Sequence, residues 1–327
     1  MKPHVVVVGS FVQDLTWRCA AFPRSGETLI GSFATGPGGK GSNQAVASGR
    51  SGVPTRFIGV VGSDVFADGA RTFYRQEGIG AVFVTKKNHP TATAAVLANE
   101  QGQNEIVVAL GASARLKPRD VAPAAIKGAR VVVCQHEASL EANAHAFRLA
   151  RRCGALTVLN PAPMRADFDA RILARTDVII PNESEFVALV RMLPQCARRA
   201  GPVPFSEAAL EALAPEPLHG LCREVGVKTV IVTLGHRGCF VSLSDGRFAH
   251  IPGHAGMKVV DTTGAGDAFV GGFAAGLARS GDVMAAAHYA NAVAALSVTK
   301  PGTAPSMPRG AEVARFLRRS AKRVPTG

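Results

Sequence analysis

The sequence is poor in aromatic and in acidic side chains, and both shortages limit the partners that it can be expected to bind. Aromatic residues make up 6% of the 327 residues, with a single tryptophan, so few side chains are available on which nucleic-acid bases could stack. The 37 basic residues outnumber the 24 acidic ones and give a formal net charge of +13, but they are scattered along the chain. We therefore expect a general attraction for anionic phosphates and no nucleic acid as partner.

Paired cysteines and long apolar runs are missing as well. The six cysteines lie far apart without a C-x-x-C spacing, which argues against a zinc site or a disulfide framework and for reduced, buried thiols. The valines after His4 are interrupted by Gly9, and the apolar stretch 283–298 contains His288 and Asn291. Neither a secretion signal nor a membrane span of about 20 residues is expected. These features favour a cytoplasmic protein without a membrane partner.

What the sequence does contain is an alternation of short apolar runs with helical patterns. Hydrophobic residues make up 47% of the chain, and the apolar runs have the length of strands that are covered on both faces. Strands that alternate with helices predict an α/β fold with a doubly wound, mainly parallel central sheet flanked by helices. The expected strands are 4–9, 129–135, 155–159, 177–180 and 228–234, and the expected helices are 140–153, 183–192 and 218–225.

Three segments interrupt this alternation within what we expect to be a single domain spanning 1–327. The segments 14–35 and 91–110 carry short β-like runs separated by turn signals, without helices between them. They predict a small separate sheet that could serve as a lid. The stretch 194–217 holds five prolines and predicts a surface insertion or linker with one short helix.

The segment 261–269 is the strongest candidate for chemistry. Gly264, Ala265 and Gly266 precede an apolar helical run, where backbone N–H groups and the helix N-terminus together form an anion hole. Asp267 follows in the first turn, placed to accept the proton of an attacking hydroxyl while the amides stabilise a transferring phosphoryl group. The alternative is a capping aspartate on a glycine-rich turn.

A second glycine-rich segment, 36–44, precedes another helical run. From its first glycine it matches the dinucleotide pattern G-x-G-x-x-G, but it fails the P-loop pattern because Lys40 is not followed by serine or threonine. Glycines such as Gly38 and Gly39 let backbone amides approach a polar ligand, and Lys40 and Asn43 supply hydrogen-bond donors for hydroxyl groups. A plain structural turn is the alternative.

Polar residues also follow several of the expected strands, at the edge where open α/β sheets place their ligands. Each group has a structural alternative, namely a turn residue, a helix cap and a hairpin. In chain order the groups are Asp14, then Asn182 with Glu185, and then Thr233 with Gly235 and Gly238. Because all of them fall at strand ends, one crevice could gather them.

These motifs, in this order, resemble the ribokinase branch of the ribokinase/phosphofructokinase-B sugar kinase family over nearly the whole chain. The resemblance rests on the glycine segments 38–44 and 261–269 and is reinforced by the segments 160–163 and 181–183. It implies a central sheet flanked by helices, with a small β-sheet lid that closes the sugar site and often forms the contact of a homodimer. It also implies an enzyme that transfers the γ-phosphoryl group of ATP to a primary hydroxyl of a pentose, with ribose as the first expectation.

Carried over residue by residue, the resemblance implies roles for most of the residues already singled out. Asp267 resembles the general base, and the backbone of Gly264, Ala265 and Gly266 the anion hole. The residues that would contact the sugar are Asp14, Gly38, Gly39, Lys40, Asn43 and Glu137. Those that would contact ATP and the water shell of its Mg²⁺ are Asn182, Glu185, Thr233, Gly235, Gly238 and Asn291. A monovalent cation, expected to be K⁺, would be held by Asp261, Thr263, Ser297, Lys300, Gly302 and Ser306, several of them through backbone oxygens.

One departure from the family pattern leaves the acceptor open. Ribokinases usually carry an asparagine two residues before the sugar-binding aspartate, and Val12 takes that place here, so that a hydrogen bond to a sugar hydroxyl is lost. A nucleoside or another sugar of the same family is therefore the alternative acceptor. A nicotinamide-dependent dehydrogenase is a more distant alternative, and it requires the glycine loop 36–44 to join the first strand directly to its helix.

Overall fold

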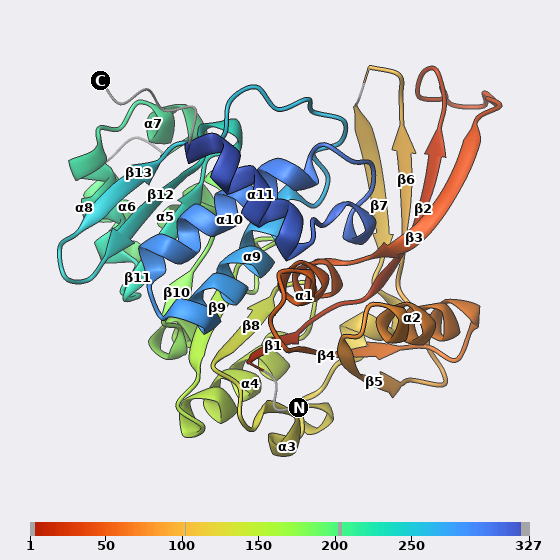
Figure 1. Ribbon diagram of the computed structural model, residues 1–327, viewed down its shortest axis with the longest axis horizontal. Helices are drawn as coiled ribbons and strands as arrows, with labels where there is room; N and C mark the ends of the chain where they lie inside the picture. Colours follow the sequence, from red (N-terminus) through yellow and green to blue (C-terminus); the bar gives the residue numbers. More distant parts are fainter. Residues whose placement is uncertain (1–3, 102, 202–204, 322–327) are drawn as a thin grey trace.

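The structure is a computed structural model that describes residues 4–101, 103–201 and 205–321. In this part of the chain the central element is a nine-stranded sheet in the order β13-β12-β11-β10-β9-β8-β1-β4-β5 (Figure 1). All neighbouring strands from β11 to β5 are parallel, and β12 and β13 are added antiparallel at one edge. The strands are β1 (Val5–Val8), β4 (Thr55–Val61), β5 (Gly80–Thr85), β8 (Val131–Gln135), β9 (Leu156–Asn160), β10 (Val178–Ile179), β11 (Thr229–Thr233), β12 (Cys239–Leu243) and β13 (Phe248–Ile251). The mainly parallel α/β sheet expected from the sequence is confirmed.

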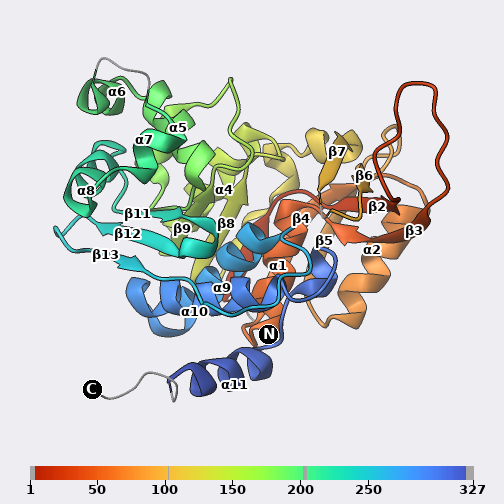
Figure 2. The ribbon, with the colours of Figure 1, turned by 90° about the horizontal axis from the view of Figure 1, so that it is seen from above.

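Helices cover both faces of this sheet. Successive residues of a strand point to opposite faces, so each buried strand contributes to two hydrophobic clusters. Val5 and Val7 belong to one buried cluster and Val6 and Val8 to the other, and Figure 2 shows the sheet between the two helical layers. The first layer contains α1 (Lys40–Arg50), α2 (Val65–Gln76), α9 (Ala265–Ser280), α10 (Val283–Ser297) and α11 (Gly310–Ala321). The second contains α3 (Pro123–Ile126), α4 (Leu140–Arg152), α5 (Glu183–Met192), α6 (Pro194–Ala200), α7 (Glu207–Glu211) and α8 (Pro215–Glu224). Short 3₁₀ segments are η1 (Gly111–Arg115), η2 (Pro118–Asp120), η3 (Ala170–Arg175), η4 (Gly235–Arg237) and η5 (Ala304–Ser306).

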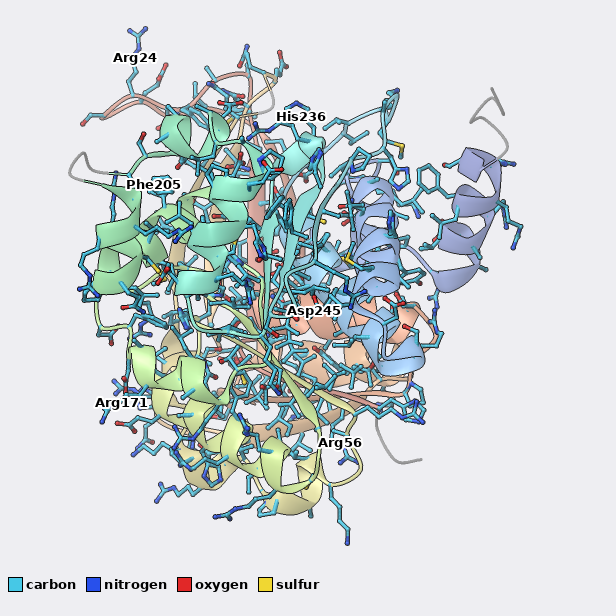
Figure 3. The ribbon with its side chains drawn as sticks, turned by 90° about the vertical axis from the view of Figure 1, so that its left-hand side faces the viewer. Arg24, Arg56, Arg171, Phe205, His236 and Asp245 are labelled. Carbon is cyan, nitrogen blue, oxygen red and sulfur yellow. The ribbon has the colours of Figure 1, made fainter. Side chains whose placement is uncertain are left out.

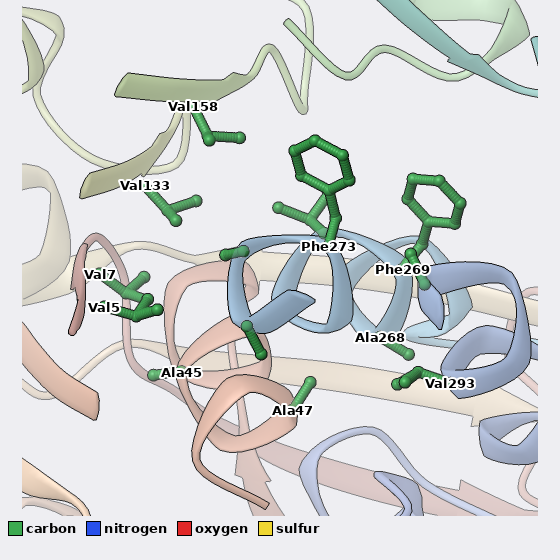
Figure 4. Close-up of a cluster of buried hydrophobic side chains, with 14 of the residues drawn as sticks. Val5, Val7, Ala45, Ala47, Val133, Val158, Ala268, Phe269, Phe273 and Val293 are labelled. Carbon is green, nitrogen blue, oxygen red and sulfur yellow. The ribbon is translucent and has the colours of Figure 1, made fainter. Parts of the chain in front are cut away.

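Glycines in α9 allow this helix to lie unusually close to α1 and α10. A Cβ atom at Gly271 would lie 2.4 Å from the backbone oxygen of Gln44, and one at Gly272 would lie 2.9 Å from the side chain of Val293. On the sheet side, Phe273 of α9 belongs to the same buried cluster as Val158 (Figure 4). The close approach holds the N-terminal ends of α1 and α9 together, and these ends carry the two glycine-rich motifs.

Four further strands form a second, smaller sheet in the order β3-β2-β6-β7, which projects from one end of the body (Figure 1). The strands are β2 (Val12–Arg18), β3 (Ser32–Gly38), β6 (Thr93–Ala98) and β7 (Asn104–Ala109). They confirm the separate small sheet expected from 14–35 and 91–110. Gly36 and Gly38 are the last two glycines of β3, so that α1 follows this small sheet and not β1. This connection contradicts the one that the dehydrogenase alternative required.

The proline-rich stretch 194–217 contains more helix than the sequence suggested. Instead of one short helix it contributes α6, α7 and the start of α8, and Pro202 and Pro204 lie outside the described residues. Pro194 and Pro215 occupy the first turns of α6 and α8, where the missing N–H group costs nothing. Proline at these two positions therefore begins a helix.

Figure 3 places Arg24, Arg56 and Arg171 at widely separated points of the molecule.

Among residues 4–101, 103–201 and 205–321, no helix has both the length and the apolarity that crossing a membrane requires.

Candidate active site

Asp267 lies in the first turn of α9, which the chain enters through Gly264. Gly264 is the N-cap residue with a φ of 82°, a left-handed conformation that glycine adopts without strain. Asp267 is only 7% exposed and lines a cavity of about 180 Å³. Its carboxylate accepts hydrogen bonds from side chains of α1, and α9 has no side-chain cap. Asp267 is therefore not the capping aspartate that the sequence left as an alternative.

The cavity gathers residues from segments that are far apart in the sequence. Asn160 and Thr233 end the strands β9 and β11, and Ile180 follows β10, which lies between them. The carboxyl ends of parallel strands therefore form one wall, as expected for open α/β sheets. The two glycine-rich motifs contribute Lys40 on one side and Asp267 on the other. The lining residues are Lys40, Asn160, Ala162, Ile180, Asn182, Glu185, Thr233, Gly264, Gly266, Asp267 and Val270.

Two amide side chains hold the carboxylate of Asp267. Asn43 Nδ2 donates to Oδ2 at 2.9 Å, and Gln44 Nε2 donates to Oδ1 at 2.9 Å. Burial raises the pKa of Asp267, and the charge of Lys40 together with the two amide hydrogen bonds opposes that rise. The sequence analysis gives no role to Gln44, the last residue of the segment 36–44. The signal that could have found it is its position directly after Asn43 in the first turns of α1, where residues 41–48 are all buried.

Lys40 is the cation of the site and faces several carboxylates. Burial lowers its pKa, but the negative charges of Asp267, Glu137 and Glu185 outweigh burial, so that the pKa is raised overall and Lys40 stays charged. Its backbone N–H, at the start of α1, donates to Glu137 Oε2 at 2.9 Å, and Ser10 Oγ donates to the same oxygen at 2.5 Å. A carboxylate at a helix N-terminus is favoured by the helix dipole.

Asp14 joins the small sheet to the body of the molecule. Thr303 Oγ1 donates to Asp14 Oδ2 at 2.8 Å, a contact that nothing in the sequence pointed to. Burial raises the pKa of Asp14 to about 6, with the Thr303 hydrogen bond opposing and the charges of Glu137 and Asp267 adding to the rise. A Cβ atom at Gly38 would lie 2.2 Å from Asp14 Oδ2, so only glycine leaves room for this carboxylate.

Asn182 and Glu185 form a capping box at the start of α5 and also line the cavity. Asn182 Oδ1 accepts from the Glu185 N–H at 2.8 Å, and Glu185 Oε2 accepts from the Asn182 N–H at 2.9 Å. The two interpretations of this segment, as a helix cap and as a ligand-facing group, are therefore compatible with each other. Burial raises the pKa of Glu185, against the Asn182 hydrogen bond and the charge of Lys40. Thr233 is bridged to Asn182 across the sheet.

Gly235, Gly238 and Asn291 lie beyond the cavity, at the edge formed by residues 251–253. Gly235 and Gly238 have φ values of 55° and 94° and frame the turn η4. A Cβ atom at Gly238 would lie 2.1 Å from the backbone oxygen of Ile251. Asn291 Nδ2 donates to that same oxygen at 3.2 Å. These three residues shape the chain next to the cavity and do not line it.

Asp261, Thr263 and Gly302, which are among the residues expected to hold a monovalent cation, come together from two loops. Asp261 Oδ1 accepts from the Thr263 N–H at 2.9 Å, and Asp261 Oδ2 accepts from the Gly302 N–H at 3.0 Å. Lys300 directs its ammonium to Glu312 at 2.9 Å, so that only its backbone could take part in a cation site. Ser297 and Ser306 donate their hydroxyl hydrogens to nearby backbone oxygens. This leaves their oxygen lone pairs available.

The family model described as pfkB family carbohydrate kinase matches residues 2–309. The chain belongs to the pfkB family of carbohydrate kinases. A ribokinase from Mus musculus is 37% identical over 93% of this chain and 91% of its own length, and a deoxyribokinase from Salmonella typhi is 34% identical over 93% of this chain and 95% of its own length.

Solved pfkB-type structures agree with the fold. The structure of a ribokinase from Giardia lamblia matches with a TM-score of 0.84 at 31% identity, covering 96% of this chain and 100% of the other. The structure of an Arabidopsis thaliana ribokinase complexed with ribose and ATP matches with a TM-score of 0.81 at 27% identity, covering 97% and 99%. The resemblance inferred from the sequence, the fold and the assignment as a carbohydrate kinase, a phosphotransferase, are confirmed.

Proposed function

We propose that this pfkB kinase transfers the γ-phosphoryl group of ATP to a primary hydroxyl of a pentose, with ribose as the first expected acceptor. The observation that carries the proposal is the position of Asp267, which lines the cavity at the N-terminus of α9 with both carboxylate oxygens held by amides. The ribokinase from Mus musculus and the Arabidopsis ribokinase complexed with ribose and ATP support the choice of acceptor and phosphoryl donor.

In the proposed mechanism Asp267 accepts the proton of the acceptor hydroxyl as that oxygen attacks the γ-phosphorus. The backbone amides of Gly264, Ala265 and Gly266 at the start of α9 stabilise the charge on the transferring group, aided by the helix dipole. Lys40 lines the same cavity and adds a positive charge. Because the transition state of phosphoryl transfer is loose, positioning and charge neutralisation contribute most of the rate enhancement.

The sugar is expected to bind between the small sheet and the start of α1. Asn43 already donates to Asp267, and its Oδ1 is buried without a hydrogen-bond partner among the described residues. A buried unpaired acceptor is costly, and a sugar hydroxyl would satisfy it. We therefore assign Asn43 an accepting role, in place of the donating one expected from the sequence. The full set of proposed sugar contacts is Asp14, Gly38, Gly39, Lys40, Asn43 and Glu137.

ATP is proposed to bind along the carboxyl ends of β10 and β11. Asn182, Glu185 and Thr233 line the cavity and would contact the phosphates and the water shell of Mg²⁺. Gly235, Gly238 and Asn291 would shape the neighbouring nucleotide edge. Within residues 4–101, 103–201 and 205–321, no three His, Cys, Asp or Glu side chains are grouped as metal ligands. Mg²⁺ in kinase sites is bound largely by nucleotide phosphates and water, and we expect it to arrive with ATP.

A monovalent cation, K⁺, is proposed to bind between the loops 261–263 and 297–306. The groups available there are a carboxylate, hydroxyls and backbone oxygens, which are the hard oxygen ligands that such a cation takes. Asp261 already ties the two loops together through backbone N–H groups. A cation at this place would set the backbone next to the anion hole. The proposed ligands are Asp261, Thr263, Ser297, Lys300, Gly302 and Ser306.

Val12 favours a second candidate acceptor, a pentose that lacks one hydroxyl. Val12 is 2% exposed and packs with Ala92 and Ala94 next to Asp14 in the small sheet. These three apolar side chains offer no hydrogen-bonding group to a sugar hydroxyl. A hydroxyl buried against them would lose its hydrogen-bond partners. The deoxyribokinase among the relatives supports such an acceptor.

A screen of acceptors distinguishes these candidates. With coupled detection of ADP, we expect turnover with ribose or deoxyribose, and a higher rate with KCl than with NaCl. Val12→Asn should raise kcat/KM for ribose relative to deoxyribose by about tenfold, because a new side-chain donor is worth roughly 1–3 kcal/mol. A strong preference for a nucleoside over every free pentose would refute the proposed acceptor class, and equal rates in KCl and NaCl would refute the proposed cation.

The small sheet is proposed to serve as a lid and as the contact of a homodimer. Trp17 and Phe33 are 38% and 56% exposed, with ring centroids 5.1 Å apart, and Val107 is 73% exposed. By the alternation of strands these side chains lie on the face opposite to Asp14. We expect Phe33→Glu combined with Val107→Glu to convert a dimer into a monomer in sedimentation experiments. Val65→Glu, at a 77% exposed position of α2, is the control and should leave the dimer intact. A wild-type monomer would rule out this contact.

All six cysteines are free thiols in the structure, and four of them are buried. Unpaired cysteines suit a reducing compartment. They support a cytoplasmic location, which cell fractionation would test by finding the protein in, or missing from, the cytoplasmic fraction.

A further inference from the structure

A chain of three buried amide side chains ends on the carboxylate of Asp267. Asn160 Nδ2 donates to the backbone oxygen of Ile180 at 2.8 Å. Gln44 Nε2 donates to Asn160 Oδ1 at 3.0 Å and to Asp267 Oδ1 at 2.9 Å. Gln135 Nε2 donates to Gln44 Oε1 at 2.6 Å. This series of amide side chains therefore links the ends of β8 and β9, and the residue that follows β10, to α1 and α9.

The direction of each amide follows from one backbone group. A carbonyl oxygen only accepts, so Asn160 must turn its NH₂ group to Ile180 and its oxygen to Gln44. Gln44 must then present its NH₂ group to both Asn160 and Asp267, and its oxygen to Gln135. If Gln44 were flipped, its oxygen would face the carboxylate of Asp267 and the oxygen of Asn160. The network thus permits one orientation of Gln44.

Packing removes other positions for these side chains. Gln44 and Gln135 are fully buried and Asn160 is 6% exposed. A Cβ atom at Gly9 would lie 2.0 Å from Gln135 Oε1, and one at Gly41 would lie 2.9 Å from it. Both positions therefore need glycine for Gln135 to fit. A side chain packed this closely has no alternative rotamer at low cost.

We propose that Gln44 is a positioning residue for phosphoryl transfer, which orients the carboxylate of Asp267 toward the acceptor hydroxyl, and that Gln135 and Asn160 fix Gln44 in turn. Gln44 holds Oδ1 while Asn43 holds Oδ2, so the plane of the carboxylate cannot rotate. A base fixed in this way needs no reorganisation at the moment of proton transfer. The inference rests on the proposed function of Asp267 as the base.

Several charged groups face Asp267 and enter its pH dependence. They are Lys40 on α1, Glu137 after β8, Glu185 on α5 and Asp14 on β2. The Gln44 hydrogen bond favours the ionised form of Asp267 and so lowers its pKa. When this bond is removed and the other groups are kept, Asp267 becomes protonated at a higher pH. Because the base acts ionised, activity is then lost at a higher pH on the acid side of the profile.

The test compares kcat, KM for ATP and the pH profile of wild type, Gln44→Met and Gln135→Met. We expect Gln44→Met to lower kcat by about tenfold or more, with KM for ATP little changed, and to move the acid limb of the kcat profile to higher pH. Gln135→Met changes a residue outside the cavity lining and should act in the same direction but more weakly, because Gln44 Oε1 then loses its donor while Asn160 still fixes its NH₂ group.

Ser48→Ala is the matched control. Ser48 lies one turn after Gln44 on α1, is fully buried and shares a 3.0 Å hydrogen bond with Thr55. The change should lower the Tm and leave kcat and the pH profile as in wild type. If Gln44→Met and Gln135→Met behave like Ser48→Ala, with a lower Tm only, Gln44 is merely structural and the inference is overturned. Should Gln44→Met fail to fold, Gln135→Met decides in the same way.

A readout without turnover separates this inference from the proposed function. If the wild type phosphorylates no pentose, the proposed function fails, whereas the titration of Asp267 can still be followed by ¹³C NMR of protein labelled at aspartate. The resonance is assigned by its loss in Asp267→Asn. A higher midpoint in Gln44→Met than in wild type supports the role of Gln44, and the same midpoint in both proteins overturns it.

Discussion

Asp267→Asn is expected to lower kcat by about 10²–10⁴-fold, the range that general-base catalysis contributes, while ATP affinity changes little. An amide cannot accept the hydroxyl proton, but it has nearly the shape of the carboxylate. It would place an NH₂ group against the donor of Asn43 or Gln44, which costs stability. It would also remove a buried negative charge whose pKa burial raises, which restores some. We therefore expect a folded protein with a Tm near that of wild type.

Turnover is measured by ADP release at saturating acceptor, and ATP affinity by titration calorimetry. Asp282→Asn is the matched control, because Asp282 caps α10 through backbone N–H groups and is not part of the cavity lining. It should retain wild-type turnover. If Asp267→Asn also turned over at the wild-type rate, Asp267 would not be the base.

Arg50→Met is expected to lower the free energy of unfolding by about 3 kcal/mol, the lower end of the cost of breaking a buried ion pair, because Arg309 Nη2 still lies 3.8 Å from Glu77 Oε2. Arg50 Nη2 and Nε donate to the two carboxylate oxygens of Glu77 at 2.7 and 2.9 Å, and the two side chains are 11% and 10% exposed. Arg50 Nη1 also donates to the backbone oxygens of Ala304, Pro305 and Met307. These residues follow Thr303, which binds Asp14, so acceptor binding should weaken as well.

Urea unfolding of Arg50→Met and wild type gives the difference. The Arg50 hydrogen bonds lower the pKa of Glu77 below its usual value of 4.5, against a smaller effect of burial. The contribution of the pair is therefore complete above pH 4.5 and is lost as the pH falls through the lowered pKa of the folded state. Arg171→Met is the control, because Arg171 and Asp169 are 88% and 47% exposed and such a pair contributes less than about 1 kcal/mol. An equally small change for Arg50→Met would show that the contacts of Arg50 with Glu77 and with the backbone at η5 are not important for stability.

The sequence alone was sufficient to predict five strands of the central sheet, β1 and β8 to β11, together with the small sheet, but it did not predict β4, β5, β12 and β13. The valines of β1 and β8 form continuous apolar runs because both faces of the sheet are covered, and that pattern is local. The glycines around Asp267 were equally informative. Gly264 is left-handed directly before the helix α9, a conformation that favours glycine. Prolines were misleading in 194–217, where the same residue that stops a helix in its interior begins one at its first turn.

The hydrogen-bond partners of the candidate site residues were decided only by the tertiary structure. Gln44 and Asp267 are 223 positions apart, and Asp14 and Thr303 are 289 apart, so no local pattern could pair them. The packing of α9 against α1, through glycines that admit a close approach, brings the first pair together, and the return of the chain at η5 brings the second. The sequence determined which chemical groups are available, because that depends on residue type and local conformation. Which of them share a hydrogen bond depends on how distant elements pack, and this packing directs the Asn43 donor to Asp267.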